Sequence, residues 1–257
     1  MREKLFDSKR SALICYIIPG YPDYETSLKL ARILLENGAD ALELGVPFSD
    51  PIADGITIQK ASYKALISGI NLKEVIKFAR ILRKEYSAPI YLMSYLNPLF
   101  KYGYEKVAEE MRDSEINGAI IPDLPVDLFD DWYRICEKFN LETVLLCSPS
   151  TSLKRIKMIE SKTTGFIYLV SIFGVTGARE YFPEYTFNFI AKVSKNTRKP
   201  IVVGFGISNP LQVKEIMKYD VDGIVVGSAI LRYFEKGNGS DTFDKIKVFL
   251  KEIKKSL

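Results

Sequence analysis

Eight short apolar runs, separated by segments with helical periodicity, set the strongest limit on how this chain can fold. Their starts lie about 30 residues apart on average, which is the length of one β-strand with its following helix. Strands this apolar that alternate with helices predict a parallel sheet covered on its outer face. In chain order the runs are SALICYI (11–17), ALELGV (41–46), PIYLMS (89–94), GAIIP (118–122), TVLLC (143–147), GFIYLVS (165–171), PIVVGF (200–205) and GIVVG (223–227).

The number of these units predicts the fold class, which is α/β, with a single (β/α)8 TIM barrel over residues 1–257. The sequence shows no linker or low-complexity tract that would mark a second domain. The longest interval follows the second run and predicts a short extra helix near residues 57–68. We also expect an extra N-terminal helix and an extra short helix after the eighth strand. A doubly wound open sheet is the alternative fold.

The absence of histidine limits the chemistry of the chain. It excludes His-ligated metal sites, Ser-His-Asp triads and an imidazole base, so acid–base chemistry must use carboxylates, tyrosine, lysine or cysteine. Lys and Arg number 36 against 32 Asp and Glu, a thin basic surplus that does not indicate nucleic acid as a partner. Three widely separated cysteines and no apolar run of membrane-spanning length favour a reducing cytoplasm. We therefore expect a cytoplasmic protein that binds neither nucleic acid nor a membrane.

The second run carries a carboxylate in its middle, at Glu43. Strand alternation places Ala41, Glu43 and Gly45 on one face, and the two leucines between them on the face toward the helices. Glu43 then points into the barrel, where burial should raise its pKa. An internal ion pair or a water could satisfy this carboxylate instead, although no Lys or Arg lies within any of the eight runs. We predict Glu43 to be a general acid–base residue.

Two aspartates follow in the loop after this run, on the side of the barrel where active sites form. Beside Pro51 and Gly55, Asp50 and Asp54 could each be an ordinary turn or cap residue. Position favours a functional Asp54, because the loop returns toward the barrel mouth above Glu43. Two carboxylates at one mouth, in different environments, can divide the roles of acid and charge stabiliser.

Glycine-rich turns follow the last three runs, at 171–180, 202–210 and 225–234. Barrels often build a phosphate site after strands seven and eight from loop amides and the N-terminus of a short helix. Gly206 and Gly227 fit this plan, with Ser228 capping the short helix, although each glycine alone could serve only its turn. The loop at 172–184 is either a lid that excludes water on closing or an ordinary surface loop.

Several segments together resemble the α subunit of tryptophan synthase, in the same order and over nearly the whole chain. The first of them, ALELGVPFSDPIADG (41–55), is highly specific, whereas a lone GFG or GSA would be weak. The chain departs from the family at Ile56, where proline is usual, and at Ile172 and Phe173, where Arg-Ala is usual; neither change removes a catalytic group. The other matching segments are GVTGARE (174–180), GFGIS (204–208), VVGSAI (225–230), PGYPD (19–23), LMSYLNP (92–98) and IPDLPVD (121–127).

The resemblance implies retro-aldol cleavage of indole-3-glycerol phosphate to indole and glyceraldehyde 3-phosphate, a lyase reaction of tryptophan biosynthesis without metal or cofactor. Glu43 matches the general acid–base residue that protonates indole C3, and Asp54 matches the carboxylate that binds the indole N–H. The family's phosphate-binding positions match Gly177, Gly206, Gly227 and Ser228. The positions that line its substrate pocket match Tyr16, Ile58, Tyr168, Phe205 and either Leu92 or Met93.

The resemblance also implies a partner, a β subunit that uses pyridoxal phosphate and receives indole through a tunnel in an α2β2 complex. Thr176 matches the lid residue that engages the catalytic aspartate. Asp50 matches a loop position at the subunit interface, so a contact role competes with its role in the turn. Two rival functions remain open: another sugar-phosphate barrel enzyme of the isomerase or epimerase type, and a non-catalytic barrel that acts as a regulatory partner.

Overall fold

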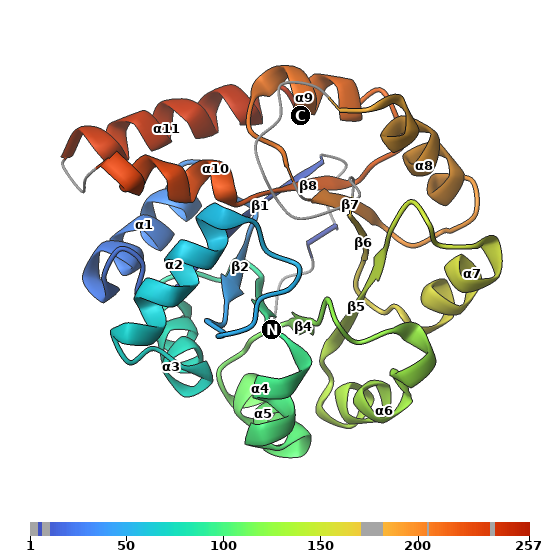
Figure 1. Ribbon diagram of the computed structural model, residues 1–257, viewed down its shortest axis with the longest axis horizontal. Coiled ribbons are helices and arrows are strands. Elements are labelled where there is room, and N and C mark those ends of the chain that lie inside the picture. The colour runs from blue at the N-terminus through green and yellow to red at the C-terminus, as the bar shows by residue number, and fades with distance from the viewer. Residues whose placement is uncertain (1–4, 7–10, 171–181, 205, 237–239) are drawn as a thin grey trace.

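The eight predicted strands form a closed barrel in which neighbouring strands are parallel. The computed structural model describes residues 5, 6, 11–170, 182–204, 206–236 and 240–257. The strands pair in chain order and the last pairs back with the first, so the doubly wound open sheet is wrong (Figure 1). They are β1 Ala12–Ile17, β2 Ala41–Gly45, β3 Ile90–Met93, β4 Gly118–Ile120, β5 Glu142–Cys147, β6 Ile167–Val170, β7 Ile201–Gly204 and β8 Gly223–Val226.

The strands lie where the apolar runs predict them, and only β5 begins one residue earlier, at Glu142. Interior side chains cover one face of the sheet and helices cover the other, so most strand residues are buried on either face. In β1, β2, β7 and β8 every residue is buried. This double burial is why each strand reads as an unbroken apolar run, and why Glu43 in β2 stands out.

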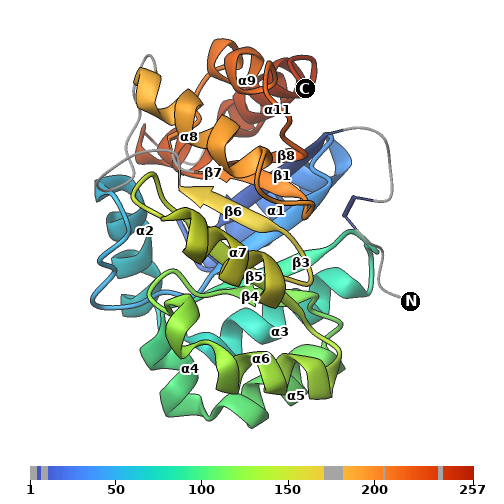
Figure 2. The same ribbon diagram turned by 90° about the vertical axis from the view of Figure 1, so that its right-hand side faces the viewer.

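Helices surround the barrel, as two views at right angles show (Figures 1 and 2). α2 (Ile56–Ile67) and α10 (Ser228–Leu231) confirm the extra helices expected after the second and eighth strands. The structure adds α4 (Leu96–Tyr102), directly after β3, which the sequence pattern does not predict. Of the expected N-terminal helix, only a turn at residues 5 and 6 is described. The other helices are α1 Tyr24–Glu36, α3 Leu72–Arg83, α5 Tyr104–Asp113, α6 Asp130–Phe139, α7 Leu153–Lys162, α8 Glu184–Ser194, α9 Pro210–Ile216 and α11 Ser240–Lys254, with 3-10 turns η1 Val126–Leu128 and η2 Arg232–Lys236.

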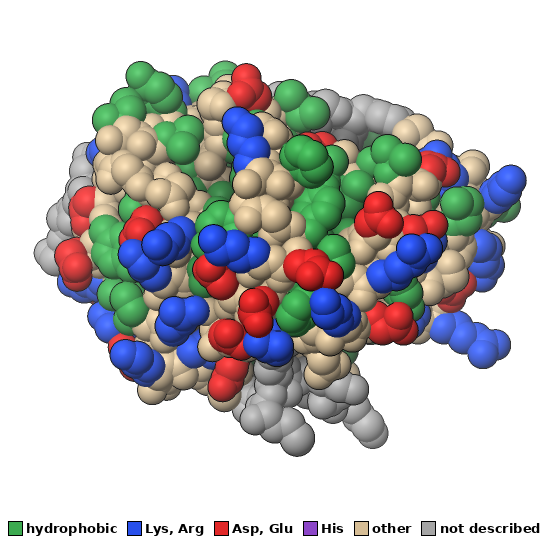
Figure 3. Space-filling model, turned by 90° about the horizontal axis from the view of Figure 1, so that it is seen from below, with side chains coloured by type: hydrophobic (Ala, Val, Ile, Leu, Met, Phe, Trp, Pro, Cys, Tyr) green, Lys and Arg blue, Asp and Glu red, His purple; other side chains and the backbone are tan. Residues whose placement is uncertain are grey.

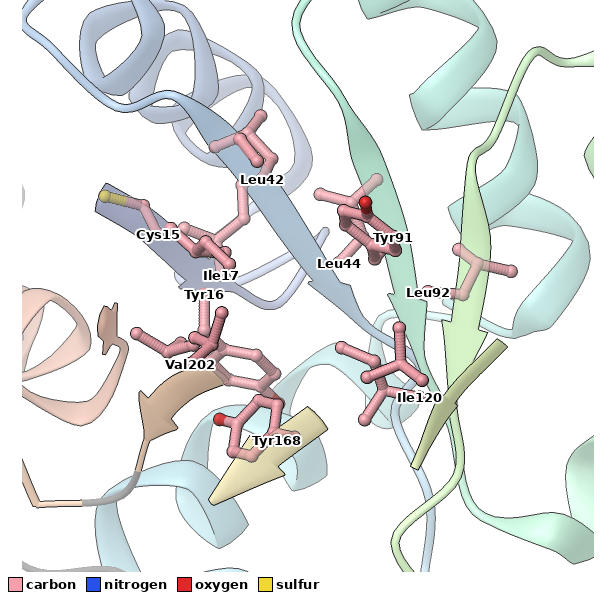
Figure 4. Packing of buried hydrophobic residues seen from close by; sticks show 14 of the residues in the cluster. Cys15, Tyr16, Ile17, Leu42, Leu44, Tyr91, Leu92, Ile120, Tyr168 and Val202 are labelled. Carbon is pink, nitrogen blue, oxygen red and sulfur yellow. The ribbon is translucent and has the colours of Figure 1, made fainter. Parts of the chain in front are cut away.

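Aromatic side chains fill the barrel interior toward the N-terminal ends of the strands. Tyr91 on β3 is fully buried, and its hydroxyl donates a hydrogen bond of 2.6 Å to Glu142 Oε2 at the start of β5. Phe166 packs edge-on against Tyr91, with ring centroids 5.3 Å apart. Figure 4 shows Tyr91 and Tyr168 among the buried side chains enclosed by the strands. This packing closes the N-terminal part of the barrel and leaves its other end for a site.

Charged side chains of both signs are interspersed on the face shown in Figure 3, so this face presents no large field of one sign. Along the helices, opposite charges pair at short spacing, as Lys77 does with Glu74 at 2.8 Å. Exposed pairs of this kind each contribute less than about 1 kcal/mol to stability. Among the helices in the described part of the chain, none combines the length and the apolar character needed to cross a membrane.

Candidate active site

A cavity of about 410 Å³, including its open mouth, lies at the C-terminal ends of the strands. Its walls come from the ends of β1, β2, β3, β6 and β8 and from the segments that follow β2, β7 and β8. The structure therefore brings together residues that lie up to about 210 positions apart in the sequence. The predicted site residues that line the cavity are Tyr16, Glu43, Asp54, Ile58, Tyr168, Gly206, Gly227 and Ser228.

Three apolar side chains complete the lining of the cavity. Met93 lines it, whereas Leu92 is fully buried and does not, which decides between the two alternatives. Ile207 and Val225 are not predicted from the sequence, because they lie in the GFGIS and VVGSAI segments, which we read only for phosphate binding. The cavity thus combines apolar walls with two carboxyls and glycine turns, the mixed lining typical of a small-molecule site.

Glu43 is buried in the barrel, as strand alternation predicts. Its side chain lines the cavity, and the residue is only 1% exposed. Among the described residues, Oε2 is buried without a hydrogen-bond partner, and no ion pair involves this carboxyl. Burial, with a smaller contribution from the charge of Asp54, raises the pKa of Glu43 to about 8. The carboxyl therefore keeps its proton at neutral pH and can act as an acid.

Asp54 lies at the same cavity in a more polar environment. It is half-buried, and its Oδ2 accepts a hydrogen bond of 3.0 Å from the Tyr95 hydroxyl. Burial raises the pKa of Asp54 to about 6, while the hydrogen bond from Tyr95 opposes the increase. At neutral pH this carboxyl is mostly ionised beside a protonated Glu43. The two carboxyls thus differ in charge at the same pH, which allows one to act as acid and the other as charge stabiliser.

Tyr95 fixes the loop that carries Asp54, and sequence reasoning missed it. Besides donating to Asp54, its hydroxyl accepts a hydrogen bond of 2.9 Å from the Ala53 N–H. Its ring packs against Phe48 in the same loop, with centroids 5.3 Å apart. The sequence signal was its place two residues beyond β3, at the barrel end where the cavity opens. Tyr95 therefore ties Phe48, Ala53 and Asp54 of this loop to the segment that follows β3.

Asp50 lies outside the cavity. It is exposed, and its carboxylate accepts a hydrogen bond from the Ser49 hydroxyl. The Asp50 carbonyl accepts a hydrogen bond of 2.9 Å from the Ile52 N–H, as in a tight turn. Asp50 is therefore held in an exposed turn and does not share the cavity with Glu43 and Asp54.

The glycine turns after β7 and β8 meet at one side of the cavity. Gly206 has a φ of +88°, a conformation that side chains rarely adopt. A Cβ at Gly227 would lie 2.9 Å from Tyr16 Cβ, so a side chain here would force Tyr16 to shift. Ser228 is the first residue of α10 and Gly227 is the N-cap, which corrects our expectation that Ser228 caps the helix. The Ser228 side chain nevertheless lines the cavity and offers its hydroxyl there.

Three predicted site residues, Thr176, Gly177 and Phe205, lie outside the described residues. The same holds for residues 172–181 of the loop predicted as a lid. Their assignments stay predictions.

Comparisons with known proteins agree with the motifs in this site. A sequence model of the family described as "Tryptophan synthase alpha chain" matches residues 3–257. The tryptophan synthase alpha chain of Dehalococcoides mccartyi is 42% identical over 97% of this chain and 96% of its own length. That of Methanosarcina mazei is 41% identical over 99% of this chain and 92% of its own length.

Solved structures of tryptophan synthases also match this chain over nearly its whole length. A structure describing mutual activation of the tryptophan synthase α2β2 complex of Pyrococcus furiosus matches with a TM-score of 0.88 and 37% identity, over 95% of this chain and 98% of that one. A Mycobacterium tuberculosis tryptophan synthase matches with a TM-score of 0.89 and 30% identity, over 98% and 96% of the two chains. On these full-length matches, the chain belongs to the tryptophan synthase alpha chain family, and with it to the lyases of tryptophan biosynthesis.

Proposed function

We propose that this protein cleaves indole-3-glycerol phosphate by a retro-aldol reaction to indole and glyceraldehyde 3-phosphate, the α reaction of tryptophan biosynthesis. Membership of the family supports lyase chemistry of this kind. The observation that carries the residue roles is the pair of carboxyls in one cavity, one protonated and the other mostly ionised at neutral pH.

In the proposed reaction, Glu43 gives its proton to indole C3, and the ring becomes a cationic indolenine. Asp54 accepts a hydrogen bond from the ring N–H and stabilises the positive charge through its own negative charge. The newly ionised Glu43 then takes the proton of the hydroxyl on the carbon attached to C3. That carbon becomes the aldehyde as its bond to C3 breaks, and the bonding electrons return to the ring. Glu43 ends protonated, so the same group serves each turnover.

We assign the phosphate to the side of the cavity formed by Gly206, Gly227 and Ser228. Backbone N–H groups in such turns, with the dipole of a helix that begins there, attract an anion. No Lys or Arg lines the described part of the cavity, which favours binding by amides and the Ser228 hydroxyl. Ile58, Met93 and the other apolar walls would hold the indole, with Tyr168 beside the glycerol chain. We place Gly177 at the phosphate and Phe205 in the substrate pocket.

We further propose that the chain works with a β subunit, as in the α2β2 complex of the Pyrococcus furiosus relative. Two large apolar side chains are exposed near Asp50: Ile52, at 75% in the same loop, and Ile56, at 69% at the start of α2. Exposed apolar groups gathered beside an active-site mouth fit a protein contact. In this proposal Thr176 closes over the substrate, and the complex is cytoplasmic.

An indole-release assay tests the proposal, with the chain alone and with a β subunit added. We expect the wild type to release indole from indole-3-glycerol phosphate, and Glu43→Gln and Asp54→Asn each to lower kcat by at least about 100-fold. Glu137→Gln, at an exposed glutamate on α6, is the matched control and should keep full activity. Turnover retained in Glu43→Gln would refute the acid–base assignment. If the wild type bound a β subunit but released no indole under either condition, the non-catalytic alternative would hold.

A further inference from the structure

Two polar groups that share the cavity lack hydrogen-bond partners among the described residues. One is Glu43 Oε2, which is buried and unpaired. The other is the hydroxyl of Tyr16, a residue only 8% exposed whose ring also lines the cavity. The carboxylate is an acceptor and the phenol is a donor. A buried carboxylate is costly to leave unpaired, and the Tyr16 hydroxyl is a donor in the same cavity that could pair with it.

The strand register places Tyr16 directly beside Glu43. Glu43 on β2 is paired with Tyr16 on β1 at one side and with Tyr91 on β3 at the other. The Tyr91 hydroxyl is occupied, because it donates to Glu142 Oε2 at 2.6 Å. The Tyr16 side chain lies in the barrel interior near Tyr168 (Figure 4), and it lines the same cavity as Glu43. Of the two tyrosines beside Glu43, only Tyr16 has a hydroxyl available for it.

The hydroxyl of Tyr16 lies over Gly45, two residues beyond Glu43 on the same face of β2. A Cβ at Gly45 would lie 2.3 Å from the Tyr16 hydroxyl oxygen, so only glycine leaves room for the phenol there. The hydroxyl is thereby held at the C-terminal end of β2, toward the cavity mouth. A flexible glutamate side chain two residues back on this face can extend toward it.

Other ionisable groups also face this pair. Asp54 is an acceptor when ionised, and Tyr95 already donates to Asp54. Tyr168 faces the cavity from β6, and the charges of both carboxyls act on Tyr168 and on Tyr16, with Asp54 contributing more than Glu43 at Tyr16. Burial and the two carboxyls raise the pKa of Tyr16 well above its usual range, so it stays a neutral donor. No Lys or Arg lines the described part of this cavity.

We propose that Tyr16 is a positioning residue for the acid–base group: its hydroxyl donates a hydrogen bond to the Glu43 carboxylate once that group has given up its proton. The proposal rests on the proposed function for its catalytic consequence. During turnover the ionised carboxylate must persist in a buried cavity until it takes the hydroxyl proton of the substrate. The hydrogen bond from Tyr16 stabilises this charged form and holds the carboxylate toward the mouth.

Tyr16→Phe tests the proposal, because it removes one oxygen atom and keeps the ring. Carbon-13 NMR of labelled glutamate carboxyls, with Glu43→Gln to assign the resonance, measures the pKa of Glu43 directly. We expect Tyr16→Phe to raise this pKa by about one unit, since a donor to the charged form is lost. In the indole-release assay, kcat should fall by about tenfold, with KM changed less than about twofold.

Tyr91→Phe is the matched control, since it removes the hydroxyl of the other tyrosine beside Glu43. It should lower the stability of the barrel, through the lost bond to Glu142, and leave the pKa of Glu43 unchanged. An unchanged Glu43 pKa in Tyr16→Phe, or an equal shift in both variants, would overturn the proposal. If the wild type released no indole, the proposed function would fail, while the titration would still decide whether Tyr16 contacts Glu43.

Discussion

Replacing Glu43 by glutamine tests the buried acid through the stability of the fold, independently of any substrate. Burial raises the pKa of this carboxyl from its ordinary value of 4.5 to about 8 in the folded protein. Each unit of pKa difference between the folded and unfolded chains corresponds to about 1.36 kcal/mol. The whole difference therefore corresponds to about 5 kcal/mol of stability that depends on pH. Glutamine has nearly the same shape and cannot ionise, so it removes this dependence.

The direction of this pH effect follows from whether the folded or the unfolded chain holds the Glu43 proton more tightly. Because the folded pKa is raised, the stabilising contribution of protonated Glu43 is fully present below pH 4.5 and is lost as pH rises through about 8. The unfolding free energy of the wild type should fall, relative to Glu43→Gln, by up to about 1.4 kcal/mol per pH unit in this window. Water that enters the cavity reduces the free-energy cost of burying the ionised Glu43 carboxylate. We expect the two proteins to agree within about 1 kcal/mol near pH 5 and the variant to be more stable by about 2–4 kcal/mol near pH 9.

Urea unfolding at several pH values measures this difference. The chain has a single tryptophan, Trp132, which is 1% exposed, so its fluorescence reports the loss of the packed core. Glu137→Gln, at an exposed position on α6, should differ from the wild type by an amount that does not change with pH. If the difference in unfolding free energy between Glu43→Gln and the wild type also did not change with pH, Glu43 would be ionised over the whole pH range measured. Its role as a buried acid would then be refuted.

The pH dependence of kcat/KM should be bell-shaped, rising through about 6 as Asp54 ionises and falling above about 8 as the buried glutamate loses its proton; a profile with neither limb would contradict the roles assigned to the two carboxyls. Tyr95→Phe removes the donor to Asp54, so the acidic limb of that profile should move to higher pH and kcat should fall by roughly tenfold. Gly227→Ala places a Cβ 2.9 Å from Tyr16 Cβ, and urea unfolding should show a loss of about 1–3 kcal/mol, with a raised KM for indole release. Asp50→Asn should leave cleavage by the chain alone unchanged and reduce its stimulation by a β subunit; unchanged stimulation would leave Asp50 as a turn residue only.

The barrel was predictable because its main signal is repeated and local. Each strand is short, apolar and followed by a helix, and eight repeats leave little choice of architecture. The helix α4 was not predictable in the same way, since it spans seven residues and contains Pro98. Its first N–H, at Leu96, donates to Asp123 Oδ1 at 2.8 Å, and Asp123 belongs to the loop after the next strand. A helix start that depends on such a distant partner leaves no local pattern in the sequence.

The same distinction between local pattern and distant contact applies to the residues of the site. Strand alternation and loop position were enough to place Glu43 and Asp54 at one cavity. The hydrogen bond from Tyr95 to Asp54 and the contact of Tyr16 with Gly45 depend on register and ring orientation across neighbouring strands. A single sequence encodes these only indirectly, through a glycine or a tyrosine that has several ordinary explanations. The structure is needed to connect each with its partner.

The two carboxyls differ in protonation because the fold holds them by different means. Glu43 is attached to a strand whose neighbours on both sides are packed, so little water can reach it and the acid keeps its proton. Asp54 is attached to a loop that one tyrosine hydroxyl holds against the barrel, which leaves it half-buried and hydrogen-bonded. Exchanging the two environments would give an ionised group where a proton must be delivered and a neutral one where positive charge develops. The chemistry we propose therefore depends on the strand and the loop as much as on the two carboxyls, and the stability lost by burying Glu43 at high pH is the measurable consequence of that arrangement.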